Sequence, residues 1–320
     1  MSVLEKKTLP FSSGEPGEHH YCQWVPEHPV AWLHIMHGMS EHGARYAEFA
    51  EFLNQQGILV TAGDHRGHGQ TGKAMDSSYH LADADGWEQM VDDQWQLINH
   101  IETRLDLPFI LMGHSMGSFM ATRFCQKYAS QIPDAFNHKL CGLILSGSSY
   151  DTPSLYKSVS YVAHFERWRL GLRNPSSVLE KLSFGSFNNA FKPNRTVSDW
   201  LSRDEKVVDQ YVDDYYCGGP LSTQSWCDFL AGMADLSRPE AMASIDKALP
   251  IYLISGALDP VSKQGLGIEK LKCALIQAGI KRVDVRLYEE ARHEILNETN
   301  RADVFKDLLY WLAGLNQSFN

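Results

Sequence analysis

"LMGHSMGSFM", residues 111–120, places Ser115 between two glycines directly after a run of apolar residues. Residues 113–117 fit the pattern G-x-S-x-G, in which a serine occupies a sharp turn between a strand and a helix. Glycines are needed on both sides of the serine because strand and helix can pack closely at such a turn only where side chains are absent. The turn lifts the hydroxyl out of the sheet, and the helix N-terminus points free N–H groups at it. Ser115 is therefore a candidate nucleophile.

The same alternation of strand and helix runs along most of the 320-residue chain. Short apolar runs that end in turn residues predict strands at 31–38, 58–65, 109–115, 142–148, 250–259 and 283–290. Most of these runs lack in/out alternation, which is typical of a parallel sheet covered on both faces. Helical patterns occupy 45–57, 86–105, 116–129, 263–279 and 298–314, and Gly57 is expected to cap the first of them. The pattern predicts a doubly wound, mostly parallel α/β sheet flanked by helices.

One stretch, residues 151–235, breaks this alternation. It contains no convincing strand, and it holds thirteen of the 35 aromatic residues of the chain. We interpret it as a helical cap inserted into a core formed by residues 1–150 and 236–320, because binding sites tend to be built on insertions at the carboxyl ends of strands. The alternative is a set of ordinary helices in which the aromatic residues form a local core.

Composition excludes several classes of partner. The net charge of -10 argues against nucleic-acid binding, which needs clustered Lys and Arg. The first 15 residues show no signal-peptide core, and no apolar run is long enough to span a bilayer. The six cysteines show no C-x-x-C spacing, so reduced thiols in a cytoplasmic protein are expected. The same net charge argues against strong electrostatic attraction to an anionic membrane, whereas apolar attachment, as peripheral contact on the inner face of a membrane, stays open.

A serine hydroxyl becomes a good nucleophile only when a base takes its proton. After a G-x-S-x-G motif, the acid and the base are expected in the order Asp or Glu, then His. Asp259 lies at the end of a predicted strand, and His293 lies in the loop after the last one. We therefore expect Ser115, Asp259 and His293 to form a catalytic triad. Glu289 and Glu290 are rival acids, and Asp259 could instead cap the turn that follows it.

The same chemistry needs N–H donors for the developing oxyanion. One should be the N–H of Met116, the residue after the nucleophile, and the other should come from the loop after an early strand. That loop is HGMSEHG, residues 37–43, in which the N–H of Met39 is the best candidate. Gly38 allows the backbone to approach the substrate. Gly38, Met39 and Met116 are the predicted substrate-binding residues.

Several motifs together resemble one known family. They are HGMSEHGARY (37–46), DHRGHGQTG (64–72), GHSMG, the aspartate of GALDP and the histidine of ARHE. The chain resembles the monoacylglycerol lipase and lysophospholipase branch of the α/β-hydrolases, also called serine aminopeptidase-like. The resemblance implies an eight-stranded sheet under a helical cap. It also implies cleavage of a carboxylic ester through an acyl-enzyme, with the triad and the oxyanion donors named above.

The resemblance is weaker in two places. Ser118 stands where many members of the family have a second glycine, although serine is tolerable in a first helical turn. In the predicted cap, LSFGSFNNAF (182–191) and DWLSRDEKVVDQYV (199–212) look more like bacterial lysophospholipase-like members than the animal lipases. The cap is where such families vary most, so substrate choice depends on it.

The function expected from the sequence is a serine hydrolase for the ester of a single-chain lipid, either a monoacylglycerol or a lysophospholipid. An aromatic-rich cap could line a channel for the acyl chain. A general carboxylesterase for short-chain esters is one alternative. An amidase or aminopeptidase with the same triad is another, and Glu41, Asp204 or Glu205 would then anchor a substrate amine. A non-enzymatic binder built on the fold is the third alternative.

No cofactor or metal is expected. Two sets of side chains could be drawn as ligands: Asp64 with His65 and His68, and His37 with Glu41 and His42. The segment HEIL (293–296) begins like the zinc motif H-E-x-x-H, but position 297 is Asn. We expect the DHRGHG segment to support the 37–43 loop through side-chain hydrogen bonds instead.

Overall fold

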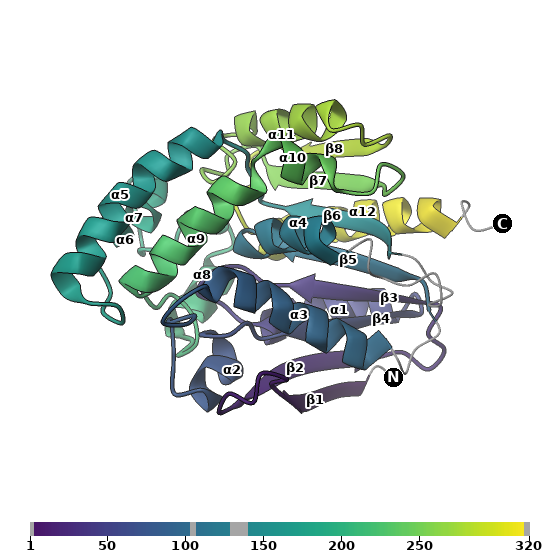
Figure 1. The fold of residues 1–320 in the computed structure, drawn as a ribbon. Coiled ribbons are helices and arrows are strands. Elements are labelled where there is room, and N and C mark those ends of the chain that lie inside the picture. Colours follow the sequence, from purple (N-terminus) through teal and green to yellow (C-terminus); the bar gives the residue numbers. More distant parts are fainter. Residues whose placement is uncertain (1–2, 103–106, 129–139, 317–320) are drawn as a thin grey trace.

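Six parallel strands and an N-terminal antiparallel hairpin form one sheet in the computed structural model, which describes residues 3–102, 107–128 and 140–316 (Figure 1). The strands are β1 (Val3–Pro10), β2 (Glu18–Val25), β3 (Ala31–Met36), β4 (Ile58–Gly63), β5 (Phe109–His114), β6 (Leu140–Ser146), β7 (Ile251–Gly256) and β8 (Val283–Tyr288). Their order across the sheet is β1-β2-β4-β3-β5-β6-β7-β8. Strands β1 and β2 pair antiparallel, β2 pairs antiparallel with β4, and all remaining pairs are parallel. The predicted mostly parallel α/β sheet is confirmed, and each of the six predicted strands forms.

Helices follow most of the parallel strands, as the sequence predicts. They are η1 (Gly43–Tyr46), α1 (Ala47–Asn54), α2 (Gly69–Ala74), α3 (Gly86–Glu102), α4 (Met116–Tyr128), α11 (Leu266–Gln277), η3 (Ile295–Asn297) and α12 (Arg301–Asn316). Gly57 has a φ of +77°, and its N–H donates to the Asn54 carbonyl at 3.0 Å, so it ends α1 as expected. Two expected helix ends, 103–105 and 129, lie outside the described residues.

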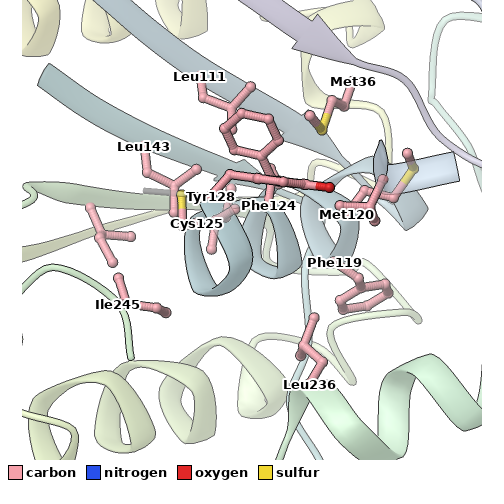
Figure 2. Packing of buried hydrophobic residues seen from close by; sticks show 14 of the residues in the cluster. Met36, Leu111, Phe119, Met120, Phe124, Cys125, Tyr128, Leu143, Leu236 and Ile245 are labelled. Carbon is pink, nitrogen blue, oxygen red and sulfur yellow. The ribbon is translucent and has the colours of Figure 1, made fainter. Parts of the chain in front are cut away.

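The hydrophobic core has two layers, one on each face of the sheet. Met36 of β3 packs on the face covered by α3, α4 and α11, whereas Leu33 and Ile35 pack on the face covered by α1 and α12. In Figure 2, Met36, Leu111 and Leu143 from three strands lie near the side chains of α4. Because both faces are covered, every residue of β3, β4 and β5 is buried. This explains why these strands are continuous apolar runs.

Helices fill the chain between β6 and β7. They are α5 (Pro153–Leu170), α6 (Ser177–Leu182), α7 (Phe184–Asn188), η2 (Asn189–Phe191), α8 (Glu205–Asp213), α9 (Thr223–Leu236) and α10 (Pro239–Ala243). Helices α5, α6 and α7 lie together beyond one end of the strands (Figure 1). Helix α9 returns to the sheet and continues past residue 235. Its Gly232 lies against the Trp87 ring of α3, where a Cβ atom would clash.

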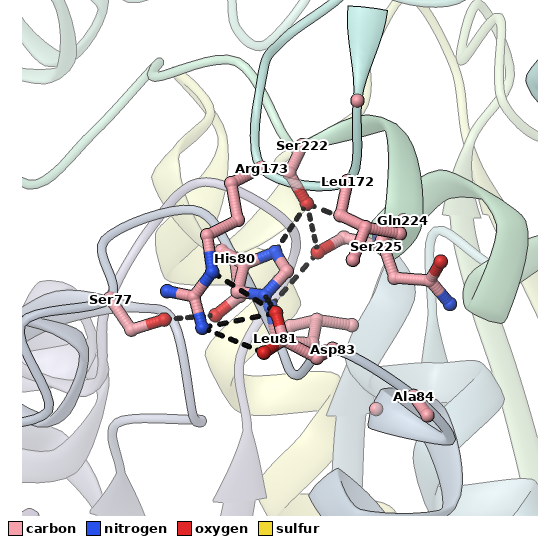
Figure 3. Close-up of polar contacts among 12 residues, drawn as sticks. Ser77, His80, Leu81, Asp83, Ala84, Leu172, Arg173, Ser222, Gln224 and Ser225 are labelled. Atoms are coloured by element: carbon pink, nitrogen blue, oxygen red, sulfur yellow. Dashed lines mark hydrogen bonds and ion pairs between the residues drawn. The ribbon is translucent and has the colours of Figure 1, made fainter. Parts of the chain in front are cut away.

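Hydrogen bonds and an ion pair connect this helical segment, at Arg173 and Ser222, with the loop at residues 77–83 (Figure 3). The His80 ring and the Ser222 hydroxyl, which caps α9, are 2.8 Å apart. The Arg173 guanidinium donates to both carboxylate oxygens of Asp83 at 3.0 Å. The residues just after α5 and just before α9 are therefore both held by the same loop.

Parallel strands bring their carboxyl ends to one edge of the sheet, and the functional candidates follow those ends. The 37–43 loop follows β3, Ser115 follows β5, Asp259 follows β7 and His293 follows β8. Among the described residues, no helix is long and apolar enough to cross a membrane.

Candidate active site

Ser115 occupies a strained turn between β5 and α4. Its φ is +51°, a left-handed value that is uncommon for a residue with a side chain. The Ser115 N–H donates to the Ser146 carbonyl at 2.8 Å, and the Ser118 hydroxyl donates to the Ser115 carbonyl at 2.6 Å. A Cβ atom at Gly113 would clash with the Gly117 carbonyl, and one at Gly117 would clash with the Met36 carbonyl. Both glycines are thus required for the turn that leaves Ser115 half-buried at the sheet edge.

Asp259 and His293 meet in a fully buried hydrogen bond. His293 Nδ1 lies 2.9 Å from Asp259 Oδ1, which also accepts the Val261 N–H at 2.8 Å. The other oxygen, Oδ2, accepts the Ser255 hydroxyl at 2.9 Å. An aspartate that accepts from Nδ1–H leaves Nε2 of the ring as the atom that can take up a proton.

The electrostatics of this pair favour a charged imidazolium. Burial is the largest single influence and lowers the pKa of His293, but the charge and hydrogen bond of Asp259, with smaller contributions from Glu294 and Glu41, together outweigh it, so the pKa lies above the ordinary histidine value. Burial also raises the pKa of Asp259, and the charge and hydrogen bonds of His293 reverse this and hold it below its ordinary value. Asp259 therefore stays ionised and stabilises a proton gained by His293.

The two rival acids lie elsewhere. Glu289 and Glu290 are exposed, and Glu290 pairs with Arg203 at 3.0 Å. Of the three acids considered from the sequence, the structure brings Asp259 to His293.

Ser115 and His293 lie beside the same short segment, Ser146–Gly147. Ser115 bonds to Ser146, and a Cβ atom at Gly147 would lie 2.8 Å from Cε1 of His293. Among the described contacts, Ser115 Oγ makes no hydrogen bond to His293. This bond is often long or poorly aligned in the absence of substrate.

The 37–43 loop lies directly against Ser115. A Cβ atom at Gly38 would be 3.2 Å from Cβ of Ser115 and 2.8 Å from a Glu41 carboxylate oxygen. Within the described part of the chain, the N–H groups of Met39 and Met116 donate to no protein acceptor. Both residues line a cavity together with Ser115, whereas the Gly38 N–H is taken by Glu41. Met39 and Met116 therefore lie at the same cavity as Ser115, whereas Gly38 does not line it.

That cavity has a volume of about 240 Å³ and a largely aromatic wall. Its walls come from the 37–43 loop, the start of α4 and the helical segment between β6 and β7. The aromatic residues are Phe119, Tyr156, Phe184, Phe187, Trp200, Trp226 and Phe229. Trp200 also contacts the His293 ring, with the two ring centres 4.9 Å apart. Asp151 and Lys263 also line the cavity, and they pair with each other.

A buried ion cluster behind the 37–43 loop was missed from the sequence. Arg45 pairs with Glu41 at 2.6 Å and with both carboxylate oxygens of Glu294 at 2.7 Å. Glu294 directly follows His293 in the chain. The motif that holds Glu41 and Arg45 was visible in the sequence, but nothing there identifies a partner 249 residues away.

The DHRGHG segment supports the 37–43 loop, as predicted. Asp64 Oδ1 accepts the Gly43 N–H at 2.9 Å, and the His65 N–H donates to the His37 ring at 3.0 Å. The rings of His37 and His65 stack with centres 3.8 Å apart. Burial lowers the pKa of His37 and His65 well below the ordinary value and that of His68 to about 4, so these rings are neutral.

Neither ligand set drawn from the sequence converges on a point that could hold a metal. In the described ranges, a different group of three side chains has donor atoms within 4.8 Å of one another: His42, which belonged to one of those sets, with Asp214 and Cys217. His42 Nε2 and Asp214 Oδ2 form an ion pair at 2.9 Å. None of these three residues lines the cavity beside Ser115.

Comparison with known proteins places this geometry in context. The family model described as "Serine aminopeptidase, S33" matches residues 27–300. The monoacylglycerol lipase of Mycolicibacterium smegmatis is 26% identical over 298 residues, which cover 92% of each chain. The phospholipase YtpA of Bacillus subtilis is 26% identical over 290 residues, covering 88% of this chain and 95% of that protein. Among solved structures, a thermostable carboxyl esterase from Bacillus coagulans superposes with a TM-score of 0.86 at 24% identity, covering 98% and 99% of the two chains.

Proposed function

Because the chain belongs to the serine aminopeptidase S33 family of α/β-hydrolases, we propose that it cleaves the carboxylic ester of a lipid carrying one acyl chain. The protein is a carboxylic ester hydrolase, like the monoacylglycerol lipase and esterase relatives that cover nearly its whole length. The observation that carries the finer proposal is the position of Ser115. It lies in the wall of an aromatic cavity, next to a buried Asp259–His293 pair.

The mechanism we infer has two half-reactions. Nε2 of His293 takes the Ser115 proton while Oγ attacks the ester carbonyl carbon, and the N–H groups of Met39 and Met116 bind the resulting oxyanion. The tetrahedral intermediate then expels the alcohol, which leaves with the proton from His293, and the acyl group stays on Ser115. A water molecule attacks the acyl-enzyme by the same route in reverse, so that a fatty acid and free Ser115 are released.

The shape of the cavity supports a single acyl chain. Its volume of about 240 Å³ lies below the roughly 300–1,000 Å³ of common ligand pockets. Aromatic rings offer apolar contact along its walls but few hydrogen-bond partners, which suits a hydrocarbon chain. The head group, glycerol or a phosphate ester of glycerol, would remain outside this cavity.

The amidase alternative is less well supported. A substrate amine would need a free carboxylate near the cavity, but Glu41 is already bonded to Gly38, Arg45 and Tyr46. Asp204 caps α8 and pairs with Arg301. Glu205 lies with Arg195 at 3.9 Å on the surface.

We also propose that residues 151–235 act as a cap whose α5 helix meets a lipid surface. Large apolar side chains stand exposed on α5: Tyr161 is 76% exposed, Phe165 55% and Trp168 80%. Residues 153–173 carry four basic side chains and one acidic side chain, in a protein of net charge -10. Aromatic and basic residues on one helix favour an anionic lipid surface. The buried side of α5 places Tyr156 in the cavity wall, which would connect the surface to the site.

The test is hydrolysis of a substrate panel by the wild type and by Ser115→Ala. The panel holds p-nitrophenyl esters of increasing chain length, a monoacylglycerol, a lysophosphatidylcholine and an aminoacyl arylamide. Ser118→Ala is the matched control, because it removes a neighbouring hydroxyl that bonds only to a backbone carbonyl. We expect Ser115→Ala to lose activity and Ser118→Ala to stay within about tenfold of the wild type, the cost of one hydrogen bond.

Three results would contradict parts of this proposal. Activity that survives in Ser115→Ala would exclude the serine mechanism. Activity confined to the shortest esters would make the protein a general carboxylesterase. Faster release from the arylamide than from a matched ester would favour the amidase.

A further inference from the structure

Arg45 is the centre of a buried cluster that joins the two halves of the candidate site. Its Nη1 lies 2.6 Å from Glu41 Oε2 and 2.7 Å from Glu294 Oε1, and its Nη2 lies 2.7 Å from Glu294 Oε2. The Arg45 side chain is 11% exposed, and both glutamate side chains are 4% exposed. One guanidinium therefore holds two carboxylates from opposite ends of the chain.

On one side, the cluster fixes the backbone of the 37–43 loop. Glu41 Oε1 accepts the Gly38 N–H at 2.5 Å and the Tyr46 hydroxyl at 2.9 Å. The Gly38 N–H belongs to the peptide immediately before the one that carries the Met39 N–H. A carboxylate held in place by Arg45 therefore sets the direction in which the Met39 donor points.

On the other side, the cluster fixes the loop that carries His293. Glu294 is the next residue, and its own N–H donates to the Leu201 carbonyl at 2.7 Å. Its Oε2 also accepts from the Asn297 side chain at 2.9 Å. Arg45 donates hydrogen bonds to both carboxylate oxygens of Glu294. The Glu294 side chain therefore cannot rotate without breaking two charge-assisted hydrogen bonds.

Helix α8 closes the cluster from the third side. The Arg45 guanidinium stacks 4.8 Å from the Tyr211 ring centre. The Tyr211 hydroxyl donates to the Ser40 carbonyl at 3.0 Å, and the Gly218 N–H donates to the same oxygen at 2.9 Å. Ser40 has a φ of +56°, so this loop needs such contacts to stay in its strained conformation.

We propose that Arg45 is a positioning residue for acyl transfer, which sets the distance between the oxyanion donor on Met39 and the base His293. This rests on the proposed function, because it concerns the same site. Two buried carboxylates beside a substrate cavity are costly unless a partner neutralises them, and apolar side chains could fill the same space. The cluster connects the 37–43 loop with the loop that carries His293. These two loops must move together if the site changes shape, and a purely apolar contact would not keep them aligned.

The experiment compares Arg45→Met with Arg45→Lys. Arg45→Met removes both the charge and the paired guanidinium donors, whereas Arg45→Lys keeps the charge but reaches only one carboxylate. Arg123→Met is the matched control. Arg123 lies on α4, and two of its guanidinium nitrogens donate to both carboxylate oxygens of Glu88, at 2.8 and 3.1 Å. Its side chain is partly buried, and its described hydrogen bonds reach neither the 37–43 loop nor His293. Active sites are counted by labelling with a fluorophosphonate, so that every rate is expressed per functional site.

For Arg45→Met we expect kcat per labelled site to fall by about 100-fold, the effect of a misplacement near 1 Å, with little change in KM. Arg45→Lys should recover part of this loss. The inhibition constant of a trifluoromethyl ketone, which forms an oxyanion on the nucleophile, should rise in parallel with the loss in kcat/KM. Arg123→Met should leave the rate per labelled site unchanged.

The proposal is overturned if kcat per labelled site in the Arg45 variants equals that of the wild type, whatever the labelled fraction. If neither Arg45 variant folds, Tyr46→Phe removes one hydroxyl bond to Glu41 and should lower kcat per site by about fivefold. An unchanged rate in Tyr46→Phe would overturn the proposal as well. Failure of the proposed function is seen separately, as activity that persists in Ser115→Ala.

Discussion

Replacing Asp259 by asparagine should change both the rate and the pH dependence of hydrolysis. The carboxylate lies 2.9 Å from Nδ1 of His293, and both groups are fully buried. The attraction between unit charges at that distance is about 6 kcal/mol at an effective dielectric constant near 20. The Asp259 carboxylate is accordingly the largest of the influences that raise the pKa of His293.

The direction of the pH effect follows from the two opposing contributions to the pKa of His293. In the wild type, Asp259, with smaller contributions from Glu294 and Glu41, outweighs burial and holds the pKa above the ordinary value of 6.5. The base must be neutral to act, so activity of the wild type should rise with pH through a midpoint above 6.5. In Asp259→Asn this attraction is lost, whereas burial still lowers the pKa and the weaker attraction of Glu294 and Glu41 still raises it, so the midpoint should move to lower pH.

The rate at the plateau should fall at the same time. Asparagine would present the wrong groups to the ring, so the required tautomer and the imidazolium would no longer be stabilised, at a cost of about 10⁴-fold in kcat. The assay is a profile of kcat/KM from pH 5 to 9 with a soluble p-nitrophenyl ester. Glu290→Gln is the control, because this exposed acid pairs with Arg203 and should leave the profile unchanged.

Two results would refute this reasoning. A plateau in Asp259→Asn within tenfold of the wild type would show that Asp259 does not serve His293. A midpoint that stays in place while the rate falls would show that the Asp259 charge does not control the titration.

Acid should destabilise the fold, because burial lowers the pKa of His19, His34, His68 and His114 to about 4. The unfolded chain takes up these protons near pH 6.5, so this contribution to stability is complete above that pH. Below it, the free energy of unfolding falls by about 1.4 kcal/mol per pH unit for each histidine, down to pH 4. Urea unfolding followed by circular dichroism should show this, and equal stability at pH 7 and pH 5 would contradict it. Trp168→Ser should weaken binding to anionic phospholipid vesicles by about 10- to 100-fold, the cost of losing one buried aromatic side chain. Vesicle sedimentation measures this against Tyr310→Ser, a control residue 83% exposed on α12, and equal binding by the two variants would remove α5 from the contact.

The positions of the six parallel strands could be predicted because each strand carries its own local signal. The runs at 31–38 and 109–115 are apolar throughout since both faces of β3 and β5 are covered. The sequence signal of the turn at Ser115 is equally local. Gly113 and Gly117 are required there because a Cβ atom at either position would clash with residues close to Ser115 or with the adjacent strand. Asp259 and His293 could be predicted because topology brings the ends of parallel strands to one edge.

The Arg45 cluster could not be predicted, because its partners are distant in the sequence. Glu41 was considered as a metal ligand or an amine anchor, and nothing in its own neighbourhood shows that its carboxylate is already occupied. Arg45 and Glu294 are 249 residues apart, and only the fold makes them neighbours. Composition also could not locate the end of the helical segment between β6 and β7. Its helix α9 packs both on the other inserted helices and on α3 of the core, so it belongs to both parts.

The direct pairing of β6 with β7 has a consequence for how such enzymes diversify. The chain leaves the sheet after β6 and returns to the neighbouring strand, with Leu143 beside Ile251. Because the two strands are parallel neighbours, the excursion leaves the carboxyl end of β6 and re-enters the sheet at the amino end of β7. The entropic cost of a closed loop grows only slowly with its length. The whole segment between β6 and β7 can therefore be lengthened, shortened or exchanged, in evolution or by design, without shifting the register of the strands that carry Ser115, Asp259 and His293. If this segment selects the substrate, as we propose, then substrate preference can change while the catalytic residues stay in place.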